Sequence, residues 1–147
     1  MASWQGIRVS LLSEVRYLEP IRALLGEATG LAGLGEEDAA QVALAVTEGC
    51  ANVIRHCYKN RTDKRIDLIL TFGDGVFDIR IDDYGTFVDP SRIRSRDLAD
   101  VRPGGLGVHL MKKVMDEVLY EKNGWGGTSL TLRKRVASRR GRGTGTA

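Results

Sequence analysis

Three polar residues in the first half of the chain share the spacing of successive helical turns. Glu48, Asn52 and His56 stand at i, i+4 and i+8, so a helix over this region would stack them on one face. A carboxylate can accept a proton from a hydroxyl group or a water, and an amide oxygen suits Mg²⁺, which needs few protein ligands. The other interpretation is a solvated polar helix face, and this pattern taken alone favours it.

A second candidate site lies where an alternating segment ends. The expected strand carries an apolar row on one face, formed by Phe77, Ile79 and Ile81. Asp83 continues this row toward the core, whereas Asp82 belongs to the opposite face. A buried carboxylate is costly unless strong donors meet it, and the amino group of a purine is such a donor. Gly85 would let a flat ring approach the backbone. An aspartate that caps a turn before Pro90 explains the segment equally well.

A glycine cluster, Gly104-Gly105-Leu106-Gly107, opens directly into an apolar helical pattern. Free backbone N–H groups at the start of a helix suit phosphate oxygens, because the helix dipole favours negative charge there. The cluster is neither a Walker sequence nor a Rossmann fingerprint, and a hinge before the helix explains it as well. The arginines of the preceding segment would either approach a triphosphate or be solvated; they are Arg92, Arg94, Arg96 and Arg102.

These motifs need a scaffold of helices and strands. The expected elements are a strand at 7–12, a helix that Ser13 caps and that ends near 30–35, a helix at 36–59, strands at about 66–72 and 77–83 joined by the turn Gly73-Asp74-Gly75, a helix from about 106, and closing strands at 118–121 and 128–133. Pro20 is expected to kink the first helix. In the last expected strand, the alternation of side chains points Thr128 toward the core, where its hydroxyl would meet Asp83 or a ligand. The alternative is an ordinary strand threonine without such a contact. This order predicts an α+β fold of two layers, with helices on one face of a mainly antiparallel sheet.

Length and composition favour one globular domain without a membrane segment. The chain has 147 residues, of which 42% are hydrophobic and 28% charged, and this balance argues against wholesale disorder. No apolar run approaches the roughly 18 residues that span a bilayer, and the first residues lack the order of a signal peptide. We therefore expect a cytoplasmic protein. Cys50 and Cys57 are two helical turns apart, too far to bond to each other, so both are expected to be reduced.

The positive net charge of +3 belongs to the C-terminus. Six basic residues and no acidic ones lie in residues 133–147, which leaves 16 basic and 19 acidic residues in the rest of the chain. We expect a domain at residues 1–135 and a basic, disordered tail at residues 136–147. The excess of acidic residues outside this C-terminal segment argues against a nucleic-acid-binding surface on the domain. The tail also lacks the aromatic residues on which bases stack.

Taken in order, four segments resemble the motifs of one family. E-G-C-A-N-V-I-R-H at 48–56, D-Y-G-T-F-V-D at 83–89, G-G-L-G-V at 104–108 and G-G-T-S-L-T-L at 126–132 resemble the N box, G1 box, G2 box and terminal strand of GHKL-type ATPases. Within these, the chain is most similar to the stand-alone serine kinases that act as anti-sigma factors in bacterial partner-switching systems. The resemblance covers residues 7 to 134, and its specificity lies in the ordered set of motifs.

The resemblance implies a Bergerat ATP-binding fold, an α+β two-layer sandwich in which a mixed, largely antiparallel sheet carries three helices on one face. It also implies ATP and Mg²⁺ as cofactors. The matching positions imply the following roles: Glu48 as general base, Asn52 as Mg²⁺ ligand, Asp83 at the adenine amino group, Gly85 beside the ring, Gly105, Leu106, Gly107 and Val108 on the phosphate side beneath a lid at 89–104, and Thr128 at the adenine end.

The same resemblance implies protein partners. The phosphoryl acceptor would be a serine or threonine of a STAS-type antagonist protein, the domain would also hold a sigma factor, and the chain would form a homodimer. Phe87 departs from the family, because the G1 box usually has a second glycine there. The alternative function is an ATP-binding module that sequesters a partner without phosphoryl transfer. Retention of Glu48 and Asn52 favours the enzyme.

Overall fold

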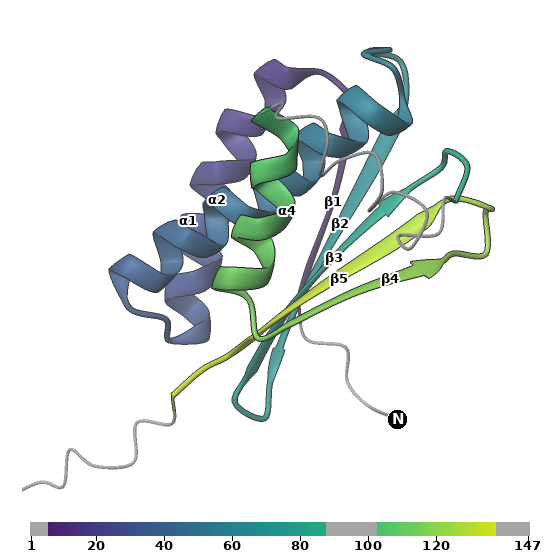
Figure 1. The fold of residues 1–147 in the computed structure, drawn as a ribbon. Coiled ribbons are helices and arrows are strands. Elements are labelled where there is room, and N and C mark those ends of the chain that lie inside the picture. Colours follow the sequence, from purple (N-terminus) through teal and green to yellow (C-terminus); the bar gives the residue numbers. More distant parts are fainter. Residues whose placement is uncertain (1–5, 88–102, 138–147) are drawn as a thin grey trace, which may run out of the picture.

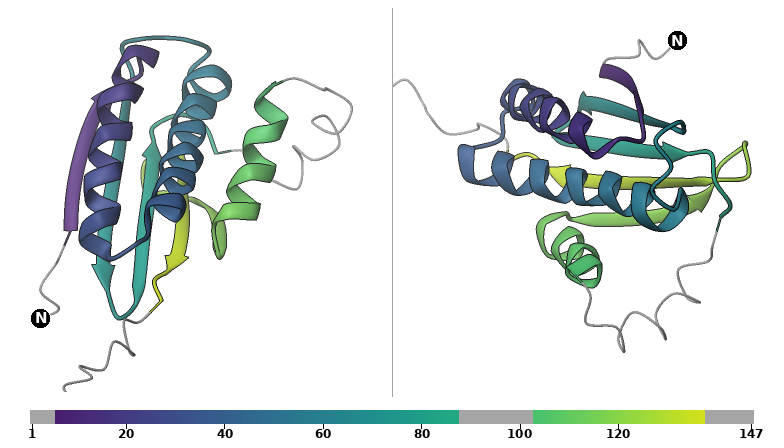
Figure 2. Two further views of the ribbon diagram at one scale, coloured as in Figure 1. Left: turned by 90° about the vertical axis from the view of Figure 1, so that its left-hand side faces the viewer. Right: turned by 90° about the horizontal axis from the view of Figure 1, so that it is seen from above.

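Helices α1, α2 and α4 lie on one face of a five-stranded sheet (Figures 1 and 2). The structure, a computed structural model, describes residues 6–87 and 103–137, with the backbone alone for residues 103–108. Its elements are β1 (Gly6–Leu12), the 3₁₀ turn η1 (Val15–Tyr17), α1 (Leu18–Ala32), α2 (Glu36–Asn52), the π-helical turn η2 (Val53–Cys57), β2 (Arg65–Gly73), β3 (Val76–Asp83), α4 (Pro103–Val114), β4 (Glu117–Lys122) and β5 (Thr128–Arg135). The α+β fold predicted from the sequence is confirmed.

The sheet has the strand order β1-β2-β3-β5-β4. Each of the four described pairings is antiparallel, so the expected antiparallel character holds and no parallel pair occurs among the described strands. One row of neighbours runs across the sheet from Val9 through Leu68 and Ile81 to Leu130. Leu68, Ile81 and Leu130 are 0%, 1% and 6% exposed, because the helical layer packs on this face.

The β2–β3 hairpin turns where the sequence predicts it. Asp74 and Gly75 form a two-residue loop with positive φ angles of 52° and 73°. Two consecutive positive φ angles define the type I′ turn, whose twist matches that of paired strands. The hairpin therefore fixes the register that carries Asp83 to the far end of β3.

The first helix begins later than predicted. Ser13 is fully buried, and its hydroxyl accepts the N–H of Lys64 at 3.2 Å and donates to the carbonyl of Arg61. Ser13 thus ties β1 to the loop before β2 and does not cap a helix. Helix α1 starts at Leu18 and has Pro20 as its third residue. The first N–H groups of a helix have no helical partner, so the proline causes no kink there.

The second helix changes its pitch before it ends. The sequence predicts a helix over residues 36–59, and α2 does begin at Glu36, but the α-helix stops at Asn52 and continues as η2 to Cys57. A π-helical turn has i→i+5 hydrogen bonds, so the side chains along it rotate away from the faces that α-helical spacing predicts.

Gly49 brings α2 close to the sheet. A methyl group at this position would lie 2.9 Å from Ile81 Cδ1, 3.5 Å from Leu130 Cδ2 and 3.7 Å from Met111 Sδ. This turn of the helix therefore packs on β3, β5 and α4 together. The neighbouring Glu48 is held at the same level, with 33% of its side chain exposed.

A buried charge occupies the sheet face that points away from the helices. Asp67 on β2 is 0% exposed and accepts two hydrogen bonds from Arg65, at 2.9 and 2.7 Å, together with one each from the hydroxyl groups of Ser10 and Tyr84. The Arg65 guanidinium, helped by both hydroxyl groups, holds the pKa of Asp67 well below its usual range. Asp67 therefore stabilises the fold as an ion.

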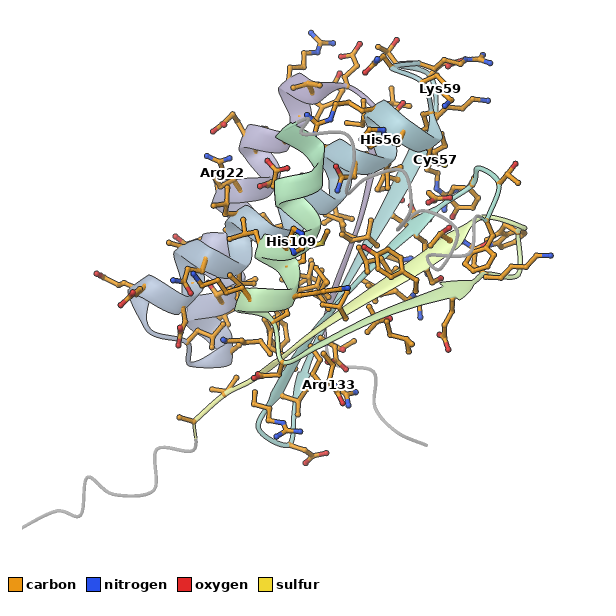
Figure 3. All side chains as sticks on the ribbon, in the orientation of Figure 1. Arg22, His56, Cys57, Lys59, His109 and Arg133 are labelled. Carbon is orange, nitrogen blue, oxygen red and sulfur yellow. The ribbon has the colours of Figure 1, made fainter. Side chains whose placement is uncertain are left out.

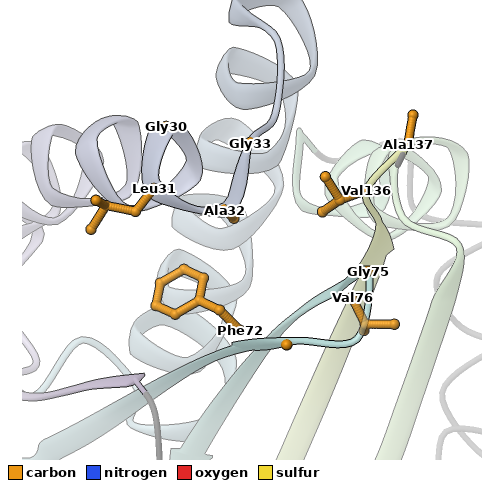
Figure 4. Close-up of a pocket in the computed structure, with 10 residues that line it drawn as sticks. Gly30, Leu31, Ala32, Gly33, Phe72, Gly75, Val76, Val136 and Ala137 are labelled. Atoms are coloured by element: carbon orange, nitrogen blue, oxygen red, sulfur yellow. The ribbon is translucent and has the colours of Figure 1, made fainter. Parts of the chain in front are cut away.

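A cavity of about 550 Å³ opens at the end of the sheet opposite Asp83 (Figure 4). It lies between the end of α1, the β2–β3 turn and Val136, and none of its lining residues has an ionisable side chain. Val136 donates its N–H to the carbonyl of Gly75 at 2.8 Å and packs against the core. Although the sequence analysis placed Val136 in the tail, these contacts are those of a domain residue; residues 138–147 lie outside the described part of the chain.

Candidate functional site

Asp83 ends β3 on the face that carries the helices. It is 4% exposed, and its Oδ1 accepts the N–H groups of Gly85 and Thr128, both at 3.1 Å. A carboxylate has about four acceptor positions, so this buried charge retains capacity for a further donor. The expectation that Asp83 continues the apolar row toward the core is confirmed by the strand register, in which Asp83 is paired with the fully buried Ile66 as Ile81 is with Leu68.

Asp82 points to the opposite face of the sheet, as strand parity predicts. It accepts the hydroxyl of Ser129 at 2.6 Å and the Nε–H of Arg80 at 3.1 Å. The two adjacent aspartates therefore differ in function: Asp82 is satisfied within the sheet, whereas Asp83 faces the helical layer.

Thr128 reaches Asp83 through its backbone. The sequence analysis proposed a contact from its hydroxyl, but the hydrogen bond to the carboxylate comes from the N–H group. Strand β5 pairs with β3 only from Ser129 onward, which leaves the Thr128 N–H available for Asp83. The side chain of Thr128 itself is partly exposed.

Gly85 lies against the thiol of Cys57. A methyl group at Gly85 would lie less than 3.0 Å from Cys57 Sγ, closer than real Cβ atoms come. A larger residue at position 85 would therefore force the thiol to move, and the glycine also suits the ring contact expected from the sequence. Burial raises the pKa of Cys57 to about 11, and the negative charge of Asp83 adds to this effect, so the thiol stays protonated near neutral pH. Figure 3 shows Cys57 beside His56 at the end of η2.

Glu48 and Asn52 share a helix face as predicted, but Arg55 accompanies them in place of His56. The Nη2 atom of Arg55 lies 3.7 Å from Glu48 Oε2 and donates a long hydrogen bond of 3.4 Å to Asn52 Oδ1. His56 is exposed. Arg55 follows Asn52 by three residues and Glu48 by seven, and both spacings lie on one face of a helix, so its contact with the pair needs no change of helical pitch. The Arg55 Nε atom is buried without a hydrogen-bond partner among the described residues.

The glycine cluster lies within a helix. Residues Gly104 to Gly107 belong to the first turns of α4, which begins at Pro103, so they do not form a loop ahead of it. Gly105, Leu106, Gly107 and Val108 therefore contribute backbone N–H groups near a helix N-terminus, and their side chains are outside the description. The four arginines and nearly all of the expected lid at 89–104 also lie outside the described residues.

The structure brings these groups to one end of the molecule. Cys57 links them, because it follows Asn52 by little more than one turn and also contacts Gly85 beside Asp83. Figures 1 and 2 show the first turns of α4 at the same end of the helical layer as the end of α2. The arrangement therefore combines a buried acceptor, a carboxylate–amide pair and a helix N-terminus.

Asn123 is a site residue that the sequence analysis missed. Its Nδ2 donates to the carbonyl oxygen of Asp83 at 2.8 Å from the turn between β4 and β5. An asparagine next to a glycine-rich turn resembles an ordinary turn residue, so no local signal identifies it. Its contact spans 40 positions of sequence and depends on the pairing of β3 with β5.

Neither a dedicated metal cluster nor a membrane helix is found in the described parts of the chain. Residues 6–87 and 109–137 hold no group of three or more His, Cys, Asp or Glu side chains placed to bind a metal. Among the described helices, none has the length and apolar content to cross a membrane.

Residues 11–134 match the family described as histidine kinase-like ATPase domain. Because the match covers most of the chain, the chain belongs to the histidine kinase-like ATPase family. The resemblance that the four sequence motifs predicted is thereby confirmed, and membership implies that the domain uses ATP.

Several relatives are named bacterial kinases. The serine-protein kinase RsbW of Staphylococcus epidermidis is 29% identical over 128 residues, covering 80% of this chain and 80% of that protein. The RsbW of Bacillus subtilis (strain 168) is 28% identical over 130 residues, covering 80% and 78%. The RsbW of Bacillus velezensis is 25% identical over 126 residues, with the same coverage of 80% and 78%.

Two solved structures share the fold. The crystal structure of the RsbU and RsbW domains of Rv1364c from Mycobacterium tuberculosis matches with a TM-score of 0.65 at 21% identity, over 89% of this chain and 32% of that one. The Erythrobacter litoralis EL346 blue-light activated histidine kinase matches with a TM-score of 0.56 at 17% identity, over 88% and 43%. This chain thus spans less than half of each solved chain, and at these identities the likeness concerns the fold.

Proposed function

We propose that the chain is an ATP-dependent serine/threonine-protein kinase that phosphorylates an antagonist protein and acts as an anti-sigma factor in a partner switch. The observation that carries this proposal is Asp83, a 4% exposed carboxylate whose Oδ1 is held by two backbone N–H groups. The family supports the use of ATP, and the names of the relatives support a serine as acceptor. A STAS-type antagonist, a sigma factor and a second copy of the chain are the proposed partners, and the cytoplasm is the proposed location.

The proposed adenine-binding residue is Asp83, at the end of β3. The Asp83 carboxylate accepts the adenine amino group with the capacity that Gly85 and Thr128 leave free. Guanine has an oxygen at the corresponding position, so the same carboxylate would repel it. The N-terminal turns of α4, with Gly105 to Val108, provide backbone N–H groups for the phosphates.

Glu48 and Asn52 are the proposed transfer residues. Their side-chain oxygens both approach the Arg55 guanidinium, at 3.7 and 3.4 Å, so this position already favours positive charge. This donor set fits Mg²⁺, which would be held by Asn52 and, when bound, neutralises the triphosphate. Glu48 accepts the proton of the attacking hydroxyl. The Arg55 side chain is 39% exposed but its Nε atom is buried, so its guanidinium would have to leave the pair when a cation binds there.

The second candidate function is an ATP-binding module that sequesters a partner without transfer. One observation favours it: Arg55 pairs with Glu48 and Asn52, the two residues that phosphoryl transfer requires. Binding of adenine at Asp83 would be unaffected by this pairing. The two functions therefore differ in whether Glu48 and Asn52 act in phosphoryl transfer.

The test is transfer of radiolabel from ATP to an antagonist protein encoded beside the gene, with nucleotide affinity measured in parallel. Glu48→Gln should retain nucleotide affinity and lose transfer by roughly a hundredfold or more. Asn52→Ala should lose both transfer and Mg²⁺-dependent affinity. Glu37→Gln makes the first change at an exposed position early in α2 and should behave as the unaltered protein.

Three results would decide between the alternatives. Full transfer by Glu48→Gln would remove Glu48 from the mechanism. Binding of ATP without transfer to any antagonist from the same locus would favour the sequestering module. A folded protein that binds no adenine nucleotide in the presence of Mg²⁺ would refute both functions.

A further inference from the structure

Asn123 makes hydrogen bonds both to the β4–β5 turn and to Asp83, at the adenine end of the proposed site. Its Oδ1 accepts the N–H groups of Trp125 and Gly127, both at 3.0 Å, and its Nδ2 donates to the carbonyl oxygen of Asp83 at 2.8 Å. Chemistry fixes the orientation of this amide, because backbone N–H groups only donate and a carbonyl oxygen only accepts. One side chain thus joins the β4–β5 turn to the residue with the buried carboxylate.

The turn that Asn123 holds packs directly on Asp83. A methyl group at Gly127 would lie 2.6 Å from Asp83 Oδ1 and 2.9 Å from its carbonyl carbon, so the turn and the end of β3 have no free space between them. The next residue, Thr128, donates its N–H to Asp83 Oδ1 at 3.1 Å. The carbonyl of Gly126 accepts the N–H of Phe87 at 2.9 Å. Movement of the turn would therefore displace a donor to the carboxylate.

We propose that Asn123 is a positioning residue for purine selectivity. It fixes the Asp83 main chain against the turn, and so sets the direction in which the carboxylate meets the amino group of adenine. The inference rests on the proposed function, because it takes Asp83 as the adenine acceptor. Hydrogen bonds weaken steeply as their angle departs from linear, so a small rotation of Asp83 costs selectivity before it costs binding of the rest of the nucleotide.

Two substitutions test this role: one keeps the bonds to the turn, and the other removes the amide without adding a charge. Asn123→Asp keeps the side-chain shape and both acceptor bonds to the turn, but it places an oxygen against the Asp83 carbonyl, where a donor is needed. Asn123→Ser adds no charge and is one bond too short to reach that carbonyl. Gln41→Glu makes the same amide-to-carboxylate change at an exposed position of α2 and is the matched control.

The measurement is the dissociation constant of ADP and of inosine diphosphate by calorimetry, with Mg²⁺ present, together with the melting temperature of each variant. Inosine has an oxygen where adenine has its amino group. The unaltered protein and Gln41→Glu should prefer ADP. In both Asn123 variants, the preference for ADP over inosine diphosphate should fall about tenfold. A change of this size corresponds to the net contribution of one ordinary hydrogen bond. Inosine diphosphate should bind nearly as before. A merely structural role would weaken both nucleotides equally.

Asp83→Asn serves as the reference for interpreting the outcome. An unchanged preference in the Asn123 variants, with a reduced preference in Asp83→Asn, overturns the inference and leaves the proposed function intact. An unchanged preference in Asp83→Asn removes Asp83 from adenine recognition and overturns both. A reduced preference in folded Asn123 variants supports the inference, and Asn123→Ser carries the same comparison if Asn123→Asp does not fold.

Discussion

The contact between Gly85 and Cys57 predicts a compensating pair of substitutions. In Gly85→Ala, the new methyl group would overlap Cys57 Sγ, at less than 3.0 Å. Its next neighbours, Asp83 Oδ1 at 3.6 Å and Cys57 Cβ at 3.8 Å, are at ordinary contact distances. The thiol is therefore the sole obstacle within 3.4 Å among the described residues. Overpacking of this kind should lower the free energy of unfolding by about 1–3 kcal/mol.

Removal of the thiol should restore the lost stability. Cys57→Ala alone deletes one partly buried atom and should cost roughly 1 kcal/mol, as for one buried methyl group. In the double variant the alanine methyl group at position 85 occupies the space that the sulfur has left. The two changes together should cost less than their sum, by a coupling free energy of about 1–3 kcal/mol.

The assay is urea denaturation of the four proteins of the cycle, with the free energy of unfolding extrapolated to water. Cys50→Ala combined with Gly85→Ala is the control, because Cys50 is a fully buried cysteine of α2 that is not among the nearest neighbours of the new methyl group. This control cycle should show no coupling. A coupling near zero between Gly85→Ala and Cys57→Ala would refute the assigned contact.

Three further predictions concern stability. Gly127→Ala should destabilise the fold by about 2–4 kcal/mol, since it overlaps Asp83 and displaces its donors. Gly124→Ala in the same turn meets nothing within 4 Å and should change the unfolding free energy by no more than about 0.5 kcal/mol. Because Arg65 lowers the pKa of Asp67, the stability from this ion is present above about pH 4, the unfolded value, and is lost as pH falls below it. Asp67→Asn should therefore flatten the acid side of a plot of unfolding free energy against pH. Deletion of residues 138–147 should leave the melting temperature unchanged, whereas a deletion that also removes residues 136–137 should lower it; equal melting temperatures would exclude docking of residue 136.

The sequence predicted the strands and their faces because side chains of a strand alternate strictly. This local rule separated Asp82 from Asp83 correctly, and it needed no knowledge of the neighbouring strands. The Asp74-Gly75 turn was equally local, since the residue types that tolerate positive φ are few. The ordered motifs identified the family, which the match of residues 11–134 confirmed.

Helix ends and contacts across the sheet were decided by the tertiary structure. Ser13 has the residue type of an N-cap, but it is buried, and the loop before β2 gave its hydroxyl other partners. The α-helix changes to a π-helical turn after Asn52, and Arg55 rather than the predicted His56 contacts Glu48. A π-turn has no strong local signature, because packing decides whether a helix tightens or widens.

The candidate site shows the same division. Sequence alone selected Glu48, Asn52, Asp83 and Gly85 as residues whose types suit nucleotide chemistry. Only the folded chain revealed that Asn123 holds Asp83 across 40 positions and that the Cys57 thiol fills the space beside Gly85. The physical reason is that periodicity reports which face a residue occupies, whereas the partner that it meets there depends on which distant segments the sheet and helices bring into contact.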